Sequence, residues 1–386
     1  MTGPMPEKQS PENVGSLPDL YDAIAPHALE ALWSISLLYP EPRTAVQPWV
    51  WEWSVVRPWL LRAGELIDTT QAERRALLFA NPGLPGSHAT TQTLVSACQL
   101  VLPGEVARSH RHSAAALRFI MEGKGGYTVV NGEKASMEVG DFITTPNWTW
   151  HDHGNEGDAP MFWLDGLDIP LVRSLDVVFF EPYATRRQPV AEQVGSSAHK
   201  FGMGVKPTYL DHHGDATPLL NYRYAQVREV LGALAKSPAG DPSDDVMVEY
   251  VNPVTGGHAL PTIAAYAQML RAGFAGQPHR HTTSAVYLVV EGEGHSIING
   301  KRFDWAKNDV ISMPMWAWHS HHNPSNTDAV LLSYTDVPVF ESLGLLRQEA
   351  TTSEDLGEVL GQSAAAAPGR ETVRESALPA PEPVLV

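Results

Sequence analysis

The chain has 386 residues, of which 43% are hydrophobic and 18% charged, and its formal net charge is −17. This composition is typical of a globular protein with two or three domains, and the negative charge argues against nucleic acid or an anionic membrane as a partner, since both attract basic surfaces. The single cysteine, Cys98, excludes an internal disulfide and any cysteine-based zinc site.

The two ends of the chain differ in composition from its middle. Residues 1–17 and 351–386 are rich in Pro, Ser, Ala and Glu, and we predict that the first segment is disordered and the second mostly so. The polar start lacks the apolar core of a signal peptide, and no stretch of about 18 apolar residues occurs. We therefore expect a cytoplasmic protein without a membrane span.

Residues 18–90 are expected to form an N-terminal region of helices and an extended arm. Five tryptophans lie between residues 33 and 59. A run of tryptophans is more typical of a core or an interface than of a ligand-binding site. We expect this region to pack on a neighbouring barrel or on another subunit.

An internal repeat organises the rest of the chain. Residues 104–155 align with residues 273–323 with a single one-residue gap. Asn131-Gly132 and Asn299-Gly300 are two-residue hairpin signals in the two copies. Short β-branched and aromatic runs predict strands, in the first copy over residues 117–121, 127–130 and 142–145.

Many short strands with even turn spacing predict a mainly β fold built of two double-sheet barrels. We place the first barrel over residues 91–180 and the second over residues 256–350. The linker over residues 181–255 is expected to contain a helix near residues 219–236 and an exposed loop at residues 239–244.

Histidines recur in register within the repeat, which holds ten of the sixteen in the chain. His110 and His112 are two residues apart on a predicted strand, so both imidazoles face the same side. His151 follows 39 residues after His112, where folded-back hairpins bring it to the same interior point. We predict a metal site there. Imidazole ligands suit iron and also a zinc ion with a bound water, so these residues leave the metal open.

The same residues resemble the two motifs of the cupin superfamily. The matching positions are Gly104, His110, His112 and Gly123 in the first motif, and Gly140, Pro146, His151 and Asn155 in the second. The resemblance implies two double-stranded β-helix (jelly-roll) barrels, a bicupin. Where most cupins place a fourth, glutamate ligand, this chain has Ala116 and Leu117. Three neutral imidazoles leave the charge of a divalent ion uncompensated, so a chelating anionic substrate can supply that compensation.

The chain more narrowly resembles the gentisate 1,2-dioxygenases and their relatives that act on salicylate and 1-hydroxy-2-naphthoate. The segments that carry this resemblance are ERRALLFANPGL at residues 73–84, TPNWTWHDHGN at residues 145–155 and DGLDIP at residues 165–170. The resemblance implies an Fe(II) enzyme of aromatic compound catabolism that is a homotetramer. It implies that O₂ is the co-substrate and that gentisate is cleaved to maleylpyruvate. Salicylate and 1-hydroxy-2-naphthoate are the alternative substrates.

Two arginines are candidates to bind the carboxylate of a small aromatic acid. Arg118 lies six residues after His112, and we expect it to share the strand face of that histidine and to pair with the carboxylate through its planar fork. The resemblance implies a pocket arginine at Arg74, although at Arg74-Arg75 the sequence leaves open which side chain faces the pocket.

Four further residues are candidates for the pocket. His153 lies two residues beyond His151, and the resemblance implies that it contacts substrate or O₂. Gln99 and Asp165 match pocket positions of the family, and Asp165 could orient a histidine or accept the 5-hydroxyl proton of gentisate. The resemblance implies that Ala97 is the residue type of gentisate enzymes, whereas the salicylate-cleaving relatives have Gly at this position. Val95 stands where several relatives have a bulky aromatic residue.

The second copy repeats the complete ligand set with His279, His281 and His319. Tyr287 stands where the first copy has Arg118, so we expect a second metal, if bound, to support little or no turnover. Two other classes are open to this sequence, a zinc-dependent cupin hydrolase or isomerase and a bicupin without enzymatic activity.

Overall fold

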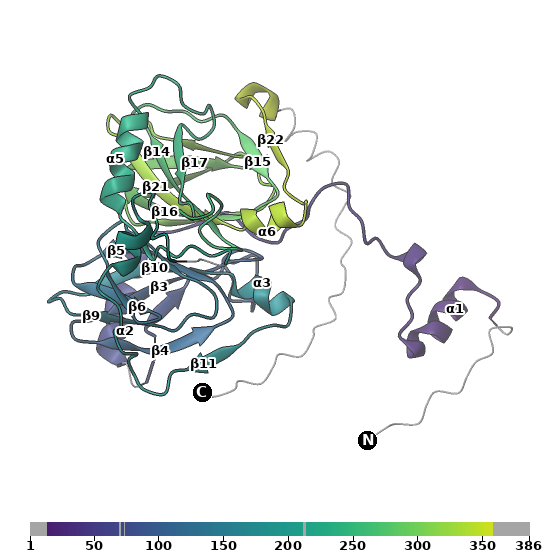
Figure 1. The fold of residues 1–386 in the computed structure, drawn as a ribbon. Coiled ribbons are helices and arrows are strands. Elements are labelled where there is room, and N and C mark those ends of the chain that lie inside the picture. Colours follow the sequence, from purple (N-terminus) through teal and green to yellow (C-terminus); the bar gives the residue numbers. More distant parts are fainter. Residues whose placement is uncertain (1–13, 69–70, 73, 211–213, 358–386) are drawn as a thin grey trace. The chain divides into compact units, whose positions relative to one another are not determined.

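The computed structural model describes residues 14–68, 71–72, 74–210 and 214–357, and the remaining segments are drawn as a grey trace in Figure 1. The chain divides into two compact units, Met1–Arg43 and Thr44–Val386. Most residues of the two end segments that we predicted to be disordered therefore lie outside the described residues. No helix in the described ranges is long and apolar enough to cross a membrane.

The first unit contains one short α-helix and two 3₁₀ turns. Helix α1 (Leu17–Ile24) begins after Ser16, whose side chain accepts a hydrogen bond from the Asp19 amide, as is typical of a helix N-cap. Turns η2 (Ala25–His27) and η3 (Leu32–Ser34) follow. None of the residues of α1 is buried.

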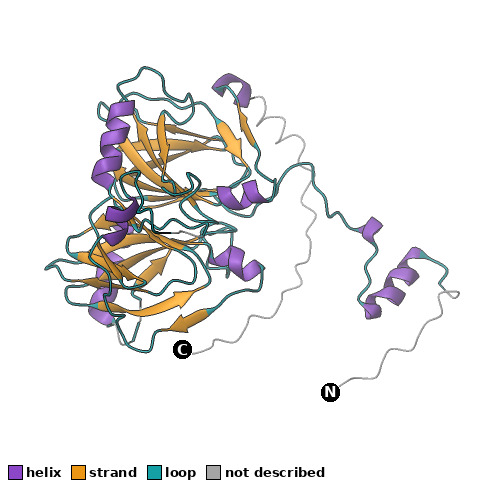
Figure 2. Cartoon of the chain, viewed as in Figure 1, coloured by secondary structure: helices purple, strands orange, loops and turns teal. Residues whose placement is uncertain are grey.

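The second unit contains two barrels, and each is made of a six-stranded and a five-stranded antiparallel sheet (Figures 1 and 2). In the first barrel the sheets have the orders β12-β8-β5-β10-β3-β2 and β11-β4-β9-β6-β7. The bounds of these strands are β2 (Ala76–Leu78), β3 (Val95–Val101), β4 (Val106–His112), β5 (Ala116–Glu122), β6 (Gly126–Val130), β7 (Glu133–Ser136), β8 (Phe142–Thr145), β9 (His151–Asn155), β10 (Met161–Leu167), β11 (Phe180–Pro182) and β12 (Asn221–Tyr222).

The second barrel repeats this arrangement with the orders β1-β19-β16-β21-β14-β13 and β18-β17-β20-β15-β22. Its strands are β1 (Trp49–Trp51), β13 (Val246–Glu249), β14 (Ala264–Leu270), β15 (His279–His281), β16 (Ala285–Glu291), β17 (Glu293–Ile298), β18 (Lys301–Ala306), β19 (Val310–Met313), β20 (His319–His322), β21 (Ala329–Thr335) and β22 (Gln348–Ala350). The helices of the unit are α2 (Trp53–Leu66), α3 (Ile169–Ser174), α4 (Ser196–Phe201), α5 (Tyr224–Leu234) and α6 (Val337–Ser342). The mainly β bicupin predicted from the repeat is confirmed.

The two hairpin signals have the backbone that a tight two-residue turn requires. Asn131 and Gly132 have φ values of 45° and 87°, and Asn299 and Gly300 have values of 48° and 77°. Positive φ at both central residues is the signature of a type I′ turn, whose twist matches that of the strands it joins. The strands predicted at residues 117–121, 127–130 and 142–145 correspond to β5, β6 and β8.

The two barrels pack against each other through their six-stranded sheets and share one hydrophobic core. Phe119 and Phe162 of the first barrel belong to the same buried cluster as Leu288 and Leu332 of the second. Two aspartates at equivalent positions of the two barrels each accept a hydrogen bond from a threonine of the other barrel. The carboxylate of Asp168 accepts a hydrogen bond from Thr262, and that of Asp336 accepts one from Thr93.

Segments outside the repeats connect the two barrels further. The N-terminal arm adds strand β1 to the second barrel beside β19, while helix α2 packs on the first barrel. There Arg57 forms an ion pair with Glu122, and Trp53 packs edge-on against Phe162. Residues 49–66 of the N-terminal region therefore pack on the barrels, which is one of the two alternatives that we expected. The linker helix is shorter than predicted because Asn221 and Tyr222 pair with β8.

His258 supplies a pH-dependent contribution to the stability of the second barrel. Its two ring nitrogens contact the carboxylates of Glu249 and Glu341. The hydrogen bond to Glu249 is the main cause that raises the pKa of His258 to about 9. Because this folded-state pKa lies above the unfolded value near 6.5, the stabilisation is complete below about pH 6.5 and is lost as the pH rises through 9.

We therefore expect His258→Gln to lower the free energy of unfolding by about 2 kcal/mol at pH 6 and by much less at pH 10. Urea unfolding of the wild type and the variant at pH 6, 8 and 10 measures this difference. A difference that is the same at all three pH values would contradict the charged pairing.

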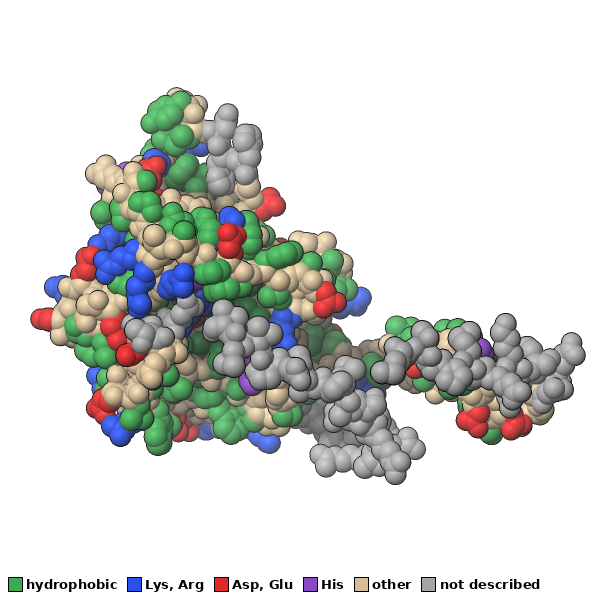
Figure 3. Space-filling view, turned by 90° about the horizontal axis from the view of Figure 1, so that it is seen from below, with side chains coloured by type: hydrophobic (Ala, Val, Ile, Leu, Met, Phe, Trp, Pro, Cys, Tyr) green, Lys and Arg blue, Asp and Glu red, His purple; other side chains and the backbone are tan. Residues whose placement is uncertain are grey.

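Hydrophobic side chains also lie on the surface, in several places on the face shown in Figure 3. In the first unit, Leu32, Trp33, Leu37 and Leu38 are 64%, 70%, 66% and 90% exposed. Such an exposed apolar segment is typical of a surface that another chain covers.

Candidate active site

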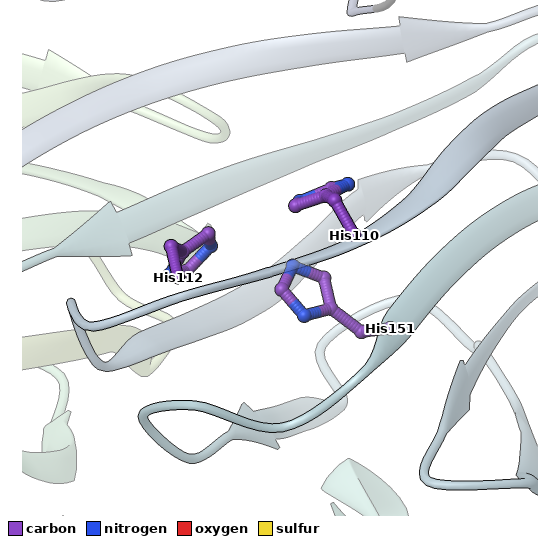
Figure 4. Close-up of side chains that lie close together, drawn as sticks. All are labelled: His110, His112 and His151. Atoms are coloured by element: carbon purple, nitrogen blue, oxygen red, sulfur yellow. The ribbon is translucent and has the colours of Figure 1, made fainter. Parts of the chain in front are cut away.

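The three histidines predicted as metal ligands come together inside the first barrel (Figure 4). His110 and His112 lie on strand β4, and His151 lies opposite His110 on the neighbouring strand β9. One nitrogen of each ring lies within 4.8 Å of a nitrogen of the other two. The alternation along β4 and the antiparallel register therefore place the side chains as the spacing predicted.

The hydrogen bonds of the three rings determine which nitrogen is available to a metal. The Nδ1 atoms of His110, His112 and His151 lie 2.8, 2.8 and 2.9 Å from the backbone oxygens of Arg108, Ala114 and Thr149. A carbonyl oxygen only accepts, so each Nδ1 carries the proton and each Nε2 presents a lone pair. The Nε2 atoms of His110 and His151 are buried and have no hydrogen-bond partner among the described residues. A bound divalent ion would satisfy them, so these residues fit a metal.

The electrostatic surroundings keep these imidazoles neutral. Burial lowers the pKa of His110 to about 2 and that of His112 to about 4, and the positive charge of Arg74 contributes to both shifts. Burial also lowers the pKa of His151 well below its usual value. At neutral pH all three rings are therefore in the form that can bind a metal.

The residues between the histidines hold their strands in place. Arg111 points away from the triad, forms an ion pair with Glu181, and stacks on Trp148 and Trp150 at 4.4 and 4.5 Å from their ring centroids. Trp148 has a φ of 60°, and its amide donates to the His112 carbonyl at 2.7 Å. Left-handed backbone at a bulky residue is strained, and such strain is common beside functional sites. These contacts connect the loop before His151 to the strand of His112.

Arg118 and Asp165 form a buried ion pair on the opposite sheet of the barrel. Asp165 on β10 lies between Arg118 on β5 and Ala97 on β3 in the strand register. The Arg118 Nε atom is 2.9 Å from Asp165 Oδ1, and its Nη1 donates to Thr145 Oγ1 at 2.6 Å. The side chains are only 5% and 10% exposed.

Arg118 is buried, but it does not share a strand with His112 as the six-residue spacing predicted. A turn at residues 113–115 separates β4 from β5, so Arg118 does not share the strand face of His112. It faces the triad from the other sheet. Burial lowers the pKa of Arg118, while burial raises the pKa of Asp165 and the Arg118 charge opposes that rise.

His153 and Gln99 are also buried in this barrel. His153 lies two residues after His151 on β9, is 1% exposed, and its Nδ1 is 2.9 Å from Thr128 Oγ1. Its ring packs edge-on against Trp163, which pairs with Gln99 in the strand register. Gln99 is 2% exposed. Because Gln99 and Ala97 are two residues apart on β3, they face the same side as Asp165.

The two adjacent arginines take different positions. Arg75 is buried, forms an ion pair with Glu105 and donates to the Ile67 carbonyl. Arg74 is exposed, yet its charge acts on His110, His112, His153 and Asp165. Of the two, Arg74 is therefore the one whose charge reaches the triad.

The second triad also assembles. One nitrogen each of His279, His281 and His319 lies within 4.8 Å of the others. Tyr287 occupies the register position of Arg118, and Ser333 on β21 occupies that of Asp165. The buried ion pair of the first barrel is thus absent from the equivalent positions of the second.

The alignment of the copies contained one signal that sequence reasoning did not use. Thr128 aligns with Ser296, and each hydroxyl lies within 2.9 Å of a histidine Nδ1, that of His153 or that of His321. A hydroxyl residue at the same place in both copies could have indicated a hydrogen-bond partner for His153 in the first copy and for His321 in the second. Trp163 and Thr145 were also missed, because their contacts depend on pairing between distant strands.

Comparisons with known proteins agree with this architecture and site. The cupin domain family matches residues 98–167 and 267–335. The chain is 39% identical over 332 residues to gentisate 1,2 dioxygenase 1 of Aquipseudomonas alcaligenes, covering 86% of this chain and 95% of that protein. It is 41% identical over 315 residues to a 5-aminosalicylate 1,2-dioxygenase of Comamonas sp, covering 80% of this chain and 83% of that protein.

Solved structures show the same likeness. The salicylate 1,2-dioxygenase of Pseudaminobacter salicylatoxidans superimposes with a TM-score of 0.81 at 33% identity, covering 89% of this chain and 99% of that one. A structure of that enzyme with gentisate gives a TM-score of 0.82 at 33% identity, covering 91% and 97%. The chain belongs to the gentisate 1,2-dioxygenase family of ring-cleaving bicupin dioxygenases, which includes the salicylate and 1-hydroxy-2-naphthoate enzymes.

Proposed function

We propose that this chain cleaves the ring of gentisate with O₂ to give maleylpyruvate, and that His110, His112 and His151 hold the Fe(II) ion that this reaction requires. The observation that carries the proposal is a neutral three-histidine site that faces a buried arginine within one barrel. The relatives named gentisate 1,2-dioxygenase support the substrate. Bound iron would supply the one-electron chemistry that lets O₂ react with a closed-shell aromatic ring.

The charges around the first triad favour an anionic aromatic acid. The position of the usual glutamate ligand is occupied by Ala116, which is fully buried and offers no ligand atom. Arg118 and Arg74 add positive charge from two directions. The planar Arg118 fork suits a carboxylate, which it would bind and orient while Asp165 holds the guanidinium in place.

The other pocket residues position the ring and its polar groups. We propose that His153, whose Nδ1 is fixed by Thr128, presents its other nitrogen to the substrate. Asp165 would also accept the 5-hydroxyl proton of gentisate, and Gln99 would contact the substrate from the same sheet. Ala97, which is 7% exposed, leaves room beside Asp165 for a ring with a 5-substituent.

The experiment that tests the proposed function is anaerobic loading with Fe(II), followed by O₂ uptake with gentisate, salicylate and 1-hydroxy-2-naphthoate in parallel. We expect rapid uptake with gentisate together with the absorbance of maleylpyruvate. Faster uptake with either of the other acids would assign that acid as the substrate. Activity that needs zinc and no O₂, or no uptake with any of the three, would contradict the proposal.

Arg74 and Arg75 provide a matched pair of variants. Because Arg74 contributes charge at the triad, we expect Arg74→Gln to raise KM for gentisate about tenfold with little change in the free energy of unfolding. Arg75→Gln breaks a buried ion pair and is expected to destabilise the fold by about 3 kcal/mol while leaving KM near the wild-type value. Steady-state kinetics and urea unfolding of both variants measure this contrast. Equal KM values for the two would show that Arg74 does not act on the substrate.

The homotetramer and the cytoplasmic location expected from the sequence stay predictions. The exposed apolar side chains of residues 32–38 support association of several copies, since burying them on a second copy would be favourable. Analytical ultracentrifugation of the full chain measures the number of subunits.

A further inference from the structure

The second barrel has a carboxylate near its histidine triad, whereas the equivalent segment of the first barrel has an arginine. Asp244 lies two residues before strand β13, and Arg74 lies two residues before β2. These strands pair with equivalent strands, and Met247 and Ala76 are the matching positions, so Arg74 corresponds to Asp245, the residue next to Asp244. We propose that Asp244 is the fourth protein ligand of a divalent metal ion held by His279, His281 and His319.

The loop that carries Asp244 is fixed over the second barrel. The sequence predicted an exposed loop at residues 239–244, and residues 239–242 are exposed, but Ser243 is buried and Asp244 is half-buried. The Asp241 Oδ1 atom accepts hydrogen bonds from the amides of Ser243 and Asp244. Asp245 is buried and forms an ion pair with Arg271, which is 30% exposed. Both ends of the turn are therefore anchored.

A residue from the barrel wall orients the Asp244 carboxylate. Gln268 on β14 is 1% exposed, and its Nε2 donates to the Asp244 carbonyl and to Asp244 Oδ1, at 3.0 Å each. Gln268 is the register equivalent of Gln99, because Met247 and Ala76 lie opposite them on the neighbouring strands. The same amide position thus faces the substrate pocket in one barrel and holds an acid in the other.

The second triad presents a buried lone pair that no described residue satisfies. His281 and His319 have Nδ1 hydrogen-bonded to the Thr283 and Ala317 carbonyls at 2.9 Å, as in the first triad. The Nε2 atom of His319, which is 1% exposed, is buried and has no partner among the described residues. The Nδ1 atom of His279 is also buried without a described partner, but its Nε2 atom is the one that faces Asp244. The unpaired Nε2 atom of His319 points to a cation as its missing partner.

The distance from Asp244 to the triad suits a shared ion. The Asp244 Oδ1 atom is 4.0 Å from His279 Nε2, and two ligands of one ion at about 2.1 Å are roughly 3 to 4.2 Å apart. The Asp244 carboxylate does not belong to the group formed by one nitrogen each of His279, His281 and His319, whose members lie within 4.8 Å of one another. Ligation therefore requires a movement of Asp244 toward the ion, which its 28% exposed side chain permits.

A carboxylate ligand changes the chemistry that the site can perform. The aspartate neutralises one of the two positive charges of a divalent ion, and together with three neutral histidines it occupies four of the ion's positions. Tyr266 and Tyr287 stand at the register positions of Ala97 and Arg118. The second site therefore has less need of an anionic chelating ligand and no arginine to receive one. This inference does not rest on the proposed function, because it concerns metal binding alone.

The test uses the full chain with the first site removed by His151→Ala. After chelation and dialysis, the protein is titrated with Co²⁺, and the bound metal is counted by mass spectrometry while the visible bands of Co²⁺ report its ligands. We expect about one Co²⁺ per subunit. Adding Asp244→Asn should weaken binding by about 10- to 100-fold and shift the visible bands. Adding His319→Ala should abolish binding.

The matched control is Asp241→Asn in the same background. It removes one negative charge from the same loop but keeps the side-chain oxygen that accepts the Ser243 and Asp244 amides. Circular dichroism confirms that each variant is folded. The proposal is overturned if the His151→Ala protein binds no Co²⁺. It is also overturned if Asp244→Asn and Asp241→Asn have the same affinity and the same spectrum, because the carboxylate would then act only through its charge or pair with His279.

Discussion

Replacing His151 with alanine is expected to lower kcat/KM for gentisate by at least about 10³-fold and to remove the metal of the first barrel. The His151 ring is 1% exposed, and its Nε2 atom has no other partner in the described chain. Only His110 and His112 on strand β4 would remain, and two imidazoles from one strand leave most positions of a divalent ion without a protein ligand. Metal analysis and O₂ uptake of the Fe(II)-loaded variant measure both effects.

The equivalent change in the second barrel provides the comparison. His319→Ala removes the matching ligand of the second triad, where Tyr287 and Ser333 replace the Arg118–Asp165 pair. We expect this variant to keep most of the O₂ uptake with gentisate. If His319→Ala abolished uptake in a protein that still contained the first metal, turnover would have to be assigned to both barrels.

Arg118→Gln is expected to have the second largest effect, because it acts on both substrate binding and stability. The variant leaves the Asp165 carboxylate buried without its cation, which costs about 3 kcal/mol of the free energy of unfolding. It also removes the donor proposed for the substrate carboxylate, so kcat/KM should fall by about 100-fold or more. Urea unfolding and steady-state kinetics measure the two losses separately.

The double variant Arg118→Gln/Asp165→Asn distinguishes the two roles of the arginine. Removing both charges eliminates the unpaired carboxylate, so much of the lost stability should return. Activity should stay low because the donor for the substrate carboxylate and the proposed acceptor of the 5-hydroxyl proton are both missing. Recovery of activity together with stability would show that Arg118 and Asp165 support only the fold.

The repeat explains why so much of this architecture was predictable. Local patterns determine a hairpin such as Asn131-Gly132 and the common face of His110 and His112, and the second copy repeated both. The third ligand, His151, needed only the spacing of folded-back hairpins. The triad therefore followed from short-range regularities that occur twice.

The contacts that were missed depend on long-range register. Asp165 pairs with Arg118 because β10 lies between β3 and β5, and no local signal contains that order. Likewise, no local pattern separates Arg74 from Arg75, since the difference arises from the ion pair of Arg75 with Glu105, which is 30 residues away in sequence. Asp244 was assigned to an exposed loop because Gln268, whose side chain binds its carboxylate, is distant in sequence.

The crossed hydrogen bonds of Asp168 and Asp336 and the core shared by the two six-stranded sheets have a consequence for how this molecule can evolve. Each barrel covers an apolar face of the other, so deleting the second would expose Phe119, Phe162 and their neighbours to water. A barrel that has lost catalysis must still be kept, because its sheet covers the apolar face of the other barrel. Its interior is then free to accept new ligands, while the outer face of its sheet stays under constraint.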